Sequence, residues 1–199
     1  MKEIIPGIFH WTRVHPKIQT EVSSFWLPEE WVLIDPLVPQ EGFDVFPEAP
    51  KNILLTNRHH LRDGLRFQER FGCAIWCADS GMEEFTKGED VTPFRAGDIL
   101  PGNIQSLKVG VICPDETALL LQREGGALFA GDGVVRFGDG PLDFVPDDYI
   151  GENPEEIKSG LRRAYAELLE KHRFDHLLLA HGAPWVGGGR QALEVFVRA

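Results

Sequence analysis

The sequence is poor in cysteine and in basic residues, and it has no long apolar run. Its three cysteines, Cys73, Cys77 and Cys113, fit reduced core thiols better than a disulfide framework. With no apolar run of membrane-spanning length and no signal peptide at Met1–Ile4, we expect a cytoplasmic protein without a membrane partner. Lys and Arg total 20 against 31 Asp and Glu, and a net charge of -11 argues against a nucleic-acid partner.

The apolar residues that are present suffice for one core, since 43% of the 199 residues are hydrophobic, and we expect a single domain over 1–199. Each half places antiparallel strands before a strand–turn–helix unit. This order predicts an α+β fold, a four-layer αββα sandwich of two mixed β-sheets with helices on the outer faces. The segments concerned are strands at 8–11, 21–26, 31–36, 53–55, 104–111, 117–122, 127–130 and 176–180, with helices at 63–71, 153–171 and 190–197. We expect loop and turn at 87–102, and an irregular loop at 137–151 that could form a lid.

The densest group of polar side chains follows the apolar strand at 53–55. Chemistry in α/β proteins is commonly placed at the carboxyl end of such a strand. A solvated, charged connection is the alternative interpretation. The candidate residues are Asn57, Arg58, His59, His60, Arg62 and Asp63.

Two further strands end in side chains that suit a metal site. Asp132 follows the 127–130 strand between two glycines, and His181 follows the strand at 176–180. Histidine and carboxylate groups at the ends of separate buried strands can converge on one metal ion. Taken alone, Asp132 is equally consistent with an ordinary Asp–Gly turn.

In their order along the chain, these segments resemble the metallo-β-lactamase superfamily. The resemblance is carried by Leu33-Ile-Asp35, the turn from Thr56, Ala130-Gly-Asp-Gly133 and Ala180-His-Gly182, and it covers nearly the whole chain. It implies the αββα sandwich and metal-dependent hydrolysis. It also implies that Asp35 is the structural aspartate of that fold.

The metal-binding motif departs from the family pattern, which reads Thr-His-x-His-x-Asp-His-x-Gly at the turn. Asn57, Leu61 and Arg62 stand where that pattern has ligands, and Ile112 stands where a later ligand histidine is usual. The positions that the resemblance leaves as metal ligands are His59, Asp132 and His181. They could hold one divalent ion (Zn, Fe or Mn), and a site without metal is equally consistent with the losses.

The first function that we consider is a hydrolase with at most one metal, which would activate water. His60 or Asp63 would be the catalytic proton shuttle, or would replace a lost ligand, and a shifted alignment would make His60 the ligand instead of His59. Arg58 and Arg62 would hold an anionic group of a small-molecule substrate. Arg62 could also pair with Asp132 and so replace the charge of the lost second metal.

The second function is a metal-free member of the fold that binds phosphate or carboxylate without hydrolysis. Its pocket would consist of Asn57, Arg58, His59, His60 and Arg62, which place several donors in one turn. A third interpretation is a scaffold or oligomer subunit without a site, and a homo-oligomer stays open for each of the three.

Overall fold

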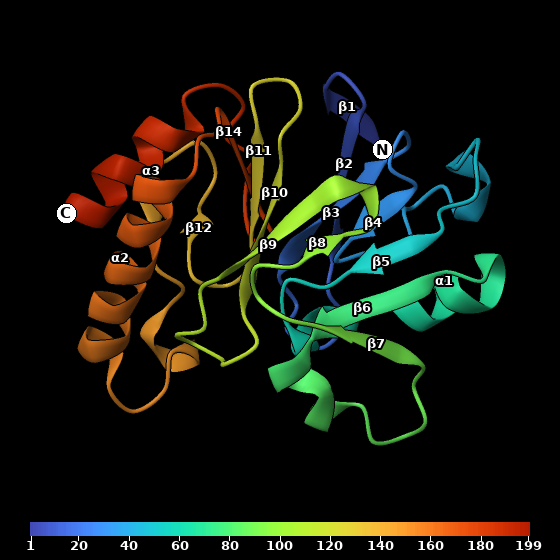
Figure 1. Ribbon diagram of the computed structural model, residues 1–199, viewed down its shortest axis with the longest axis horizontal. Helices are drawn as coiled ribbons and strands as arrows, with labels where there is room; N and C mark the ends of the chain where they lie inside the picture. The colour runs from blue at the N-terminus through green and yellow to red at the C-terminus, as the bar shows by residue number, and fades with distance from the viewer.

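The computed structural model describes residues 1–199 and contains two large β-sheets packed face to face (Figure 1). The first sheet has the order β1-β2-β3-β4-β5-β6-β7, antiparallel from β1 to β4 and parallel from β4 to β7. Its strands are β1 Lys2–Ile5, β2 Ile8–Val14, β3 Glu21–Leu27, β4 Val32–Ile34, β5 Asn52–Leu54, β6 Ala74–Ala78 and β7 Val91–Phe94.

The second sheet has the order β14-β11-β10-β9-β8, and only its β11–β14 pair is parallel. Its strands are β8 Ile99–Leu100, β9 Ile104–Lys108, β10 Thr117–Leu121, β11 Ala127–Ala130 and β14 His176–Leu179. A small separate pair joins β12 Val135–Arg136 to β13 Leu142–Asp143. Both large sheets are therefore mixed, as the sequence predicts.

The three α-helices cover the outer faces of the two sheets. The first, α1 (Gly64–Phe71), packs on the first sheet through buried Phe67. The second sheet is covered by α2 (Pro154–Lys171) and α3 (Gly189–Arg198), which lie together at the opposite end of the molecule (Figure 1). The four-layer αββα sandwich predicted from the sequence is thus the observed fold.

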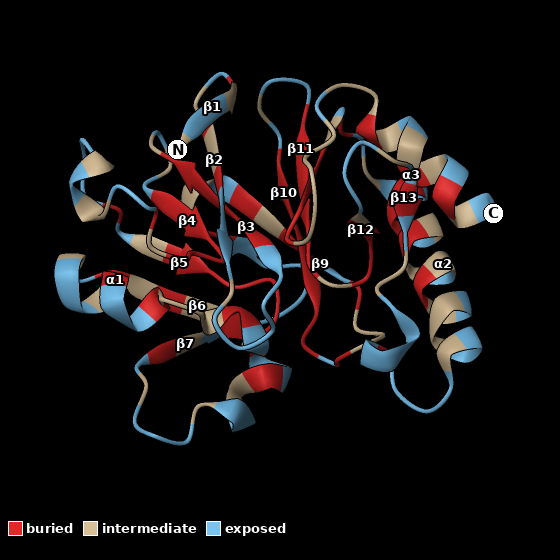
Figure 2. Cartoon of the chain, turned by 180° about the vertical axis from the view of Figure 1, so that it is seen from behind, coloured by how far each residue is buried: buried red, intermediate tan, exposed pale blue.

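The core follows these layers, and buried residues concentrate on the strands (Figure 2). Between the sheets, Phe25 of β3 meets Phe129 of β11 edge to face, with ring centroids 5.2 Å apart. Strands that are covered on both faces read as continuous apolar runs, which is why β5, β11 and β14 were recognisable from sequence. The three cysteines are buried and free, as expected.

The prediction of loop and turn over 87–102 is wrong in part, because β7 and β8 lie there. The β7 strand, Val91-Thr-Pro-Phe94, forms the edge of the first sheet, where Pro93 is tolerated. The β8 strand is only Ile99–Leu100. Such short segments, one interrupted by proline, lack the alternation by which a strand is recognised. The 137–151 segment likewise contains β13.

Candidate metal centre

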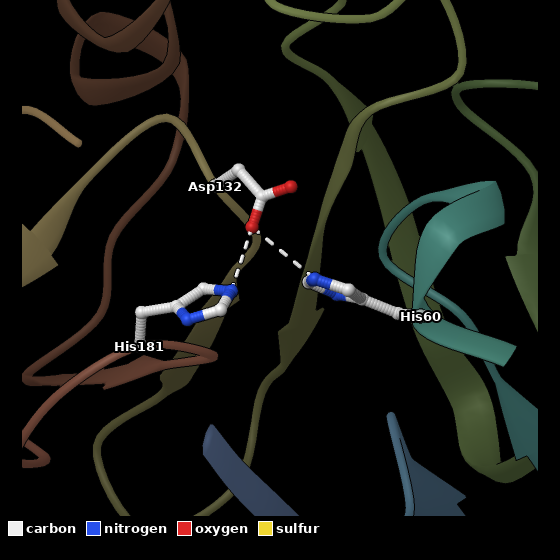
Figure 3. Close-up of side chains that lie close together, drawn as sticks. All are labelled: His60, Asp132 and His181. Carbon is white, nitrogen blue, oxygen red and sulfur yellow. Dashed lines mark ion pairs between the residues drawn. The ribbon is translucent and has the colours of Figure 1, made fainter. Parts of the chain in front are cut away.

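Three side chains that are far apart in the sequence meet where strands of both sheets end. His60 lies in the turn after β5, Asp132 follows β11 and His181 follows β14 (Figure 3). Their potential ligand atoms all lie within 4.8 Å of one another. The strands of a parallel pair end at the same edge, and this brings Asp132 and His181 together. The first sheet contributes His60 from the opposite side.

Both histidines contact the same carboxylate oxygen. The Oδ1 atom of Asp132 lies 2.9 Å from His181 Nε2 and 3.2 Å from His60 Nε2. The side chain of His60 is 6% exposed, whereas those of Asp132 and His181 are 22% and 21% exposed. The group is therefore buried on the His60 side and open to solvent on the other.

A second carboxylate lies behind His60 and fixes the orientation of its ring. Asp35 Oδ2 is 2.9 Å from His60 Nδ1 and accepts a hydrogen bond from the Thr56 hydroxyl at 2.6 Å. The other oxygen of Asp35 accepts the Thr56 backbone N–H at 2.9 Å. The ring of His60 must therefore direct Nε2 towards Asp132.

The electrostatics of this group follow from the alternation of acids and histidines. Burial opposes a charge on His60, but Asp132 and Asp35 outweigh it and raise the pKa of His60 to about 9. Burial would raise the pKa of Asp132, yet the charge of His60 and a hydrogen bond from His181 hold it well below its ordinary value. Without a metal, His60 therefore carries a proton at neutral pH and pairs with two carboxylates.

The assignment of His59 as the ligand of this turn is corrected by the structure. His59 is exposed, and it is its backbone N–H, not its ring, that bonds to the turn, through Asn57 Oδ1 at 2.9 Å. Residues Arg58–Leu61 form a 3₁₀ turn, in which successive side chains point roughly 120° apart. His60 takes the inward direction, as the shifted alignment allowed.

Asn57 lies in the site, but it contacts Asp132 and offers no surface to a substrate. Its side-chain N–H donates to Asp132 Oδ2 at 2.9 Å, and Asn57 is 0% exposed. This bond occupies the oxygen of Asp132 that the histidines do not contact. In this structure the Asn57 amide is thus bonded to the Asp132 carboxylate, and its binding of a substrate stays a prediction.

The two arginines predicted to bind an anion have partners within the protein. Arg58 donates to buried Asp115 through Nη1 at 2.7 Å and through its backbone N–H at 2.5 Å. Arg62 donates through Nη1 to the backbone oxygens of Ser23 and Asp35, at 2.5 and 2.7 Å. The predicted Arg62–Asp132 ion pair is not formed, and it is His60 that pairs with Asp132.

Asp63 is also held outside the group of three. Its Oδ2 accepts the Val38 backbone N–H at 2.8 Å, and its Oδ1 pairs with Arg66 at 3.3 Å. These contacts fasten the start of α1 to the preceding loop. The structure thus shows the Asp63 carboxylate bonded within this region, and its role as a proton shuttle stays a prediction.

Sequence reasoning missed Glu116, which is 0% exposed and lies just before β10. Its Oε1 accepts the Gly133 backbone N–H at 2.6 Å. Burial, and then the charge of Asp132, raise the pKa of Glu116 to about 8. Glu116 lies in a Pro-Asp-Glu stretch that contains no recognisable motif. Only its burial distinguishes it, and the sequence does not show burial.

The donor set fits one divalent cation. Two imidazoles and one carboxylate suit Zn²⁺, Fe²⁺ or Mn²⁺, and the Asp35–His60 contact is the usual support behind a ligand histidine. A second ion would need Asp132 Oδ2, which Asn57 occupies, and it would face Ile112 where the resemblance expects a histidine. The structure therefore offers one group of three side chains that could hold an ion.

Comparison with solved structures gives the fold a name. A class B3 metallo-β-lactamase described as having an active-site glutamic acid is 16% identical, with a TM-score of 0.67, over 99% of this chain and 85% of that one. A β-lactamase domain protein from Burkholderia ambifaria is 17% identical, with a TM-score of 0.66, over 98% and 74%.

The flavodiiron protein from Giardia intestinalis is 15% identical, with a TM-score of 0.69, over 99% of this chain and 57% of that one. Neither a family model nor a curated protein matches the sequence. The chain has the metallo-β-lactamase fold. No helix in the structure is both long and apolar enough to cross a membrane.

Proposed function

We propose that this chain is a metal-dependent hydrolase that holds a single divalent cation through His60, Asp132 and His181. The observation that carries the proposal is the convergence of both Nε2 atoms on Asp132 Oδ1, at 3.2 and 2.9 Å. A cation bound there would lower the pKa of a water ligand to near neutrality and so supply the nucleophile. The substrate is a small molecule that reaches the open side of the group.

The residues of the chain prepare this site in three ways. Asp35 holds the His60 ring by Nδ1, which leaves Nε2 directed at the site. Asn57 binds Asp132 Oδ2 and leaves Oδ1 as the oxygen that is offered. His181 is partly exposed, so it borders the space where a substrate would lie.

The second candidate is the metal-free protein that binds a small anion. It is favoured by the observation that Asp35, His60 and Asp132 already satisfy one another as ion pairs. It is weakened because Arg58 is bonded to Asp115 and Arg62 Nη1 to two backbone oxygens, so that of these two arginines only Arg62 Nη2 is a buried donor without a partner. We therefore place it second.

Metal analysis and activity of the same preparation separate the two. We expect one equivalent of Zn²⁺, Fe²⁺ or Mn²⁺ per chain, and hydrolysis of p-nitrophenyl acetate or bis-p-nitrophenyl phosphate that chelation abolishes and metal restores. A protein that takes up no metal, even when titrated with each ion, would contradict the hydrolase and leave the anion binder.

A further inference from the structure

The loop that carries Asp132 lies against the carboxyl group of Glu116. Glu116 Oε1 accepts the Gly133 N–H at 2.6 Å. A Cβ atom added to Gly131 would lie 3.3 Å from this oxygen, and one added to Gly133 would lie 3.0 Å from it. The glycines on either side of Asp132 therefore leave room for Glu116, together with Thr56 at Gly131 and with Tyr165 and Leu161 at Gly133.

The other oxygen of Glu116 is buried and lacks a hydrogen-bond partner. Glu116 Oε2 and the hydroxyl of Tyr165 on α2 are both buried without a hydrogen-bond partner. A Cβ atom at Gly133 would lie 2.8 Å from the Tyr165 hydroxyl, so the phenol and Glu116 approach the same point of the backbone. Unpaired buried polar groups are rare, and two at one place behind a candidate site point to a function.

We propose that Glu116 is the positioning residue of Asp132 and acts by accepting the Gly133 N–H, a task that needs an oxygen acceptor but no negative charge. This inference rests on the proposed function, because Asp132 would be fixed in order to present Oδ1 to a cation. The complete burial of Glu116 agrees with a carboxyl group that works uncharged. Glutamine retains the acceptor and brings amide donors to the side of Oε2, so it should replace Glu116.

The test compares Glu116→Gln with Glu116→Ala, and uses Glu30→Gln as a matched control. Glu30 is a partly buried carboxyl group whose pKa is also raised, and its partner is Arg123. Two measurements are made on each protein. NMR of the chelator-treated protein follows the Gly133 amide proton and the Asp132 carboxyl carbon, and titration with Co²⁺ follows visible absorption.

We expect Glu116→Gln and the control to keep both NMR signals and to bind Co²⁺ within about threefold of the wild type. Glu116→Ala should shift both signals and weaken Co²⁺ binding by about 10–100-fold, the usual cost of losing such support. If Glu116→Ala does not fold, Glu116→Asp, whose acceptor is too short to reach Gly133, should give the same losses.

Two results would overturn the inference. One is an equal loss in Glu116→Gln and Glu116→Ala, which would mean that the charge matters and the acceptor does not. The other is an unchanged Asp132 signal in both Glu116→Ala and Glu116→Asp. A wild-type protein that binds no Co²⁺ would instead contradict the proposed function, while the NMR comparison would still decide the role of Glu116.

Discussion

At the scale of single residues, the neighbours His59 and His60 differ in every property that matters for the site. His60 is buried between Asp35 and Asp132, whereas His59 is exposed and uses only its backbone N–H within the turn. Replacing His60 by alanine should abolish the binding of one equivalent of Zn²⁺ in a calorimetric titration, because one of three ligands is removed and Asp35 no longer has a ligand to orient. His59→Ala is the matched control and should bind zinc as the wild type does. Equal losses in both variants would contradict this assignment.

Asn57 offers a second test at this scale, because its amide is the only side chain found on Asp132 Oδ2. Asn57→Ala should weaken zinc binding by about 10–100-fold and lower the free energy of unfolding by about 1–3 kcal/mol, since a buried acceptor loses its donor. Calorimetry and urea denaturation measure the two effects. Asn52→Ala is the control on β5, the strand before this turn, where the amide oxygen accepts from Trp76 and does not touch Asp132. Unchanged zinc binding in Asn57→Ala would contradict the claim that Asn57 orients the Asp132 carboxylate.

At the scale of elements, the Arg58–Asp115 pair joins the turn after β5 to the loop before β10. Asp115 is buried, and both of its oxygens are bonded to Arg58. Removing Arg58 leaves the buried Asp115 carboxylate uncompensated, so Arg58→Ala should lower the free energy of unfolding by about 3–5 kcal/mol in urea denaturation. Arg66→Ala removes an exposed pair with Asp63 and should cost less than about 1 kcal/mol. Similar costs for the two variants would show that the Arg58–Asp115 pair does not join these loops.

His10, on β2 where it pairs with β3, makes the free energy of unfolding depend on pH. Burial lowers the pKa of His10 from 6.5 to about 4, and its Nε2 lies 2.9 Å from the Ser23 hydroxyl. In the window from pH 6.5 to 4 the unfolded chain binds more protons than the folded one, so the free energy of unfolding should fall as pH falls, by at most about 3 kcal/mol. Comparing pH profiles of urea denaturation for the wild type and His10→Gln isolates this effect. Parallel profiles would show that His10 does not contribute.

At the scale of the whole molecule, the sequence was sufficient for the layers and for the strand ends that meet. Buried strands such as β11 and β14 can be recognised in the sequence as apolar runs. Asp132 and His181 each lie two residues after the end of one of these strands. The sequence could not choose between His59 and His60, because the choice depends on the direction of a 3₁₀ turn. Nor could it assign Arg58, Arg62 and Glu116, whose partners are brought to them only by tertiary packing.

The central claim is that one divalent cation binds between His60, Asp132 and His181. A crystal grown or soaked with Zn²⁺ and measured at the zinc absorption edge tests it most directly. The account predicts one anomalous peak, about 2.0–2.2 Å from His60 Nε2, Asp132 Oδ1 and His181 Nε2. It would be contradicted by the absence of any peak at these residues, or by a peak at His59 instead.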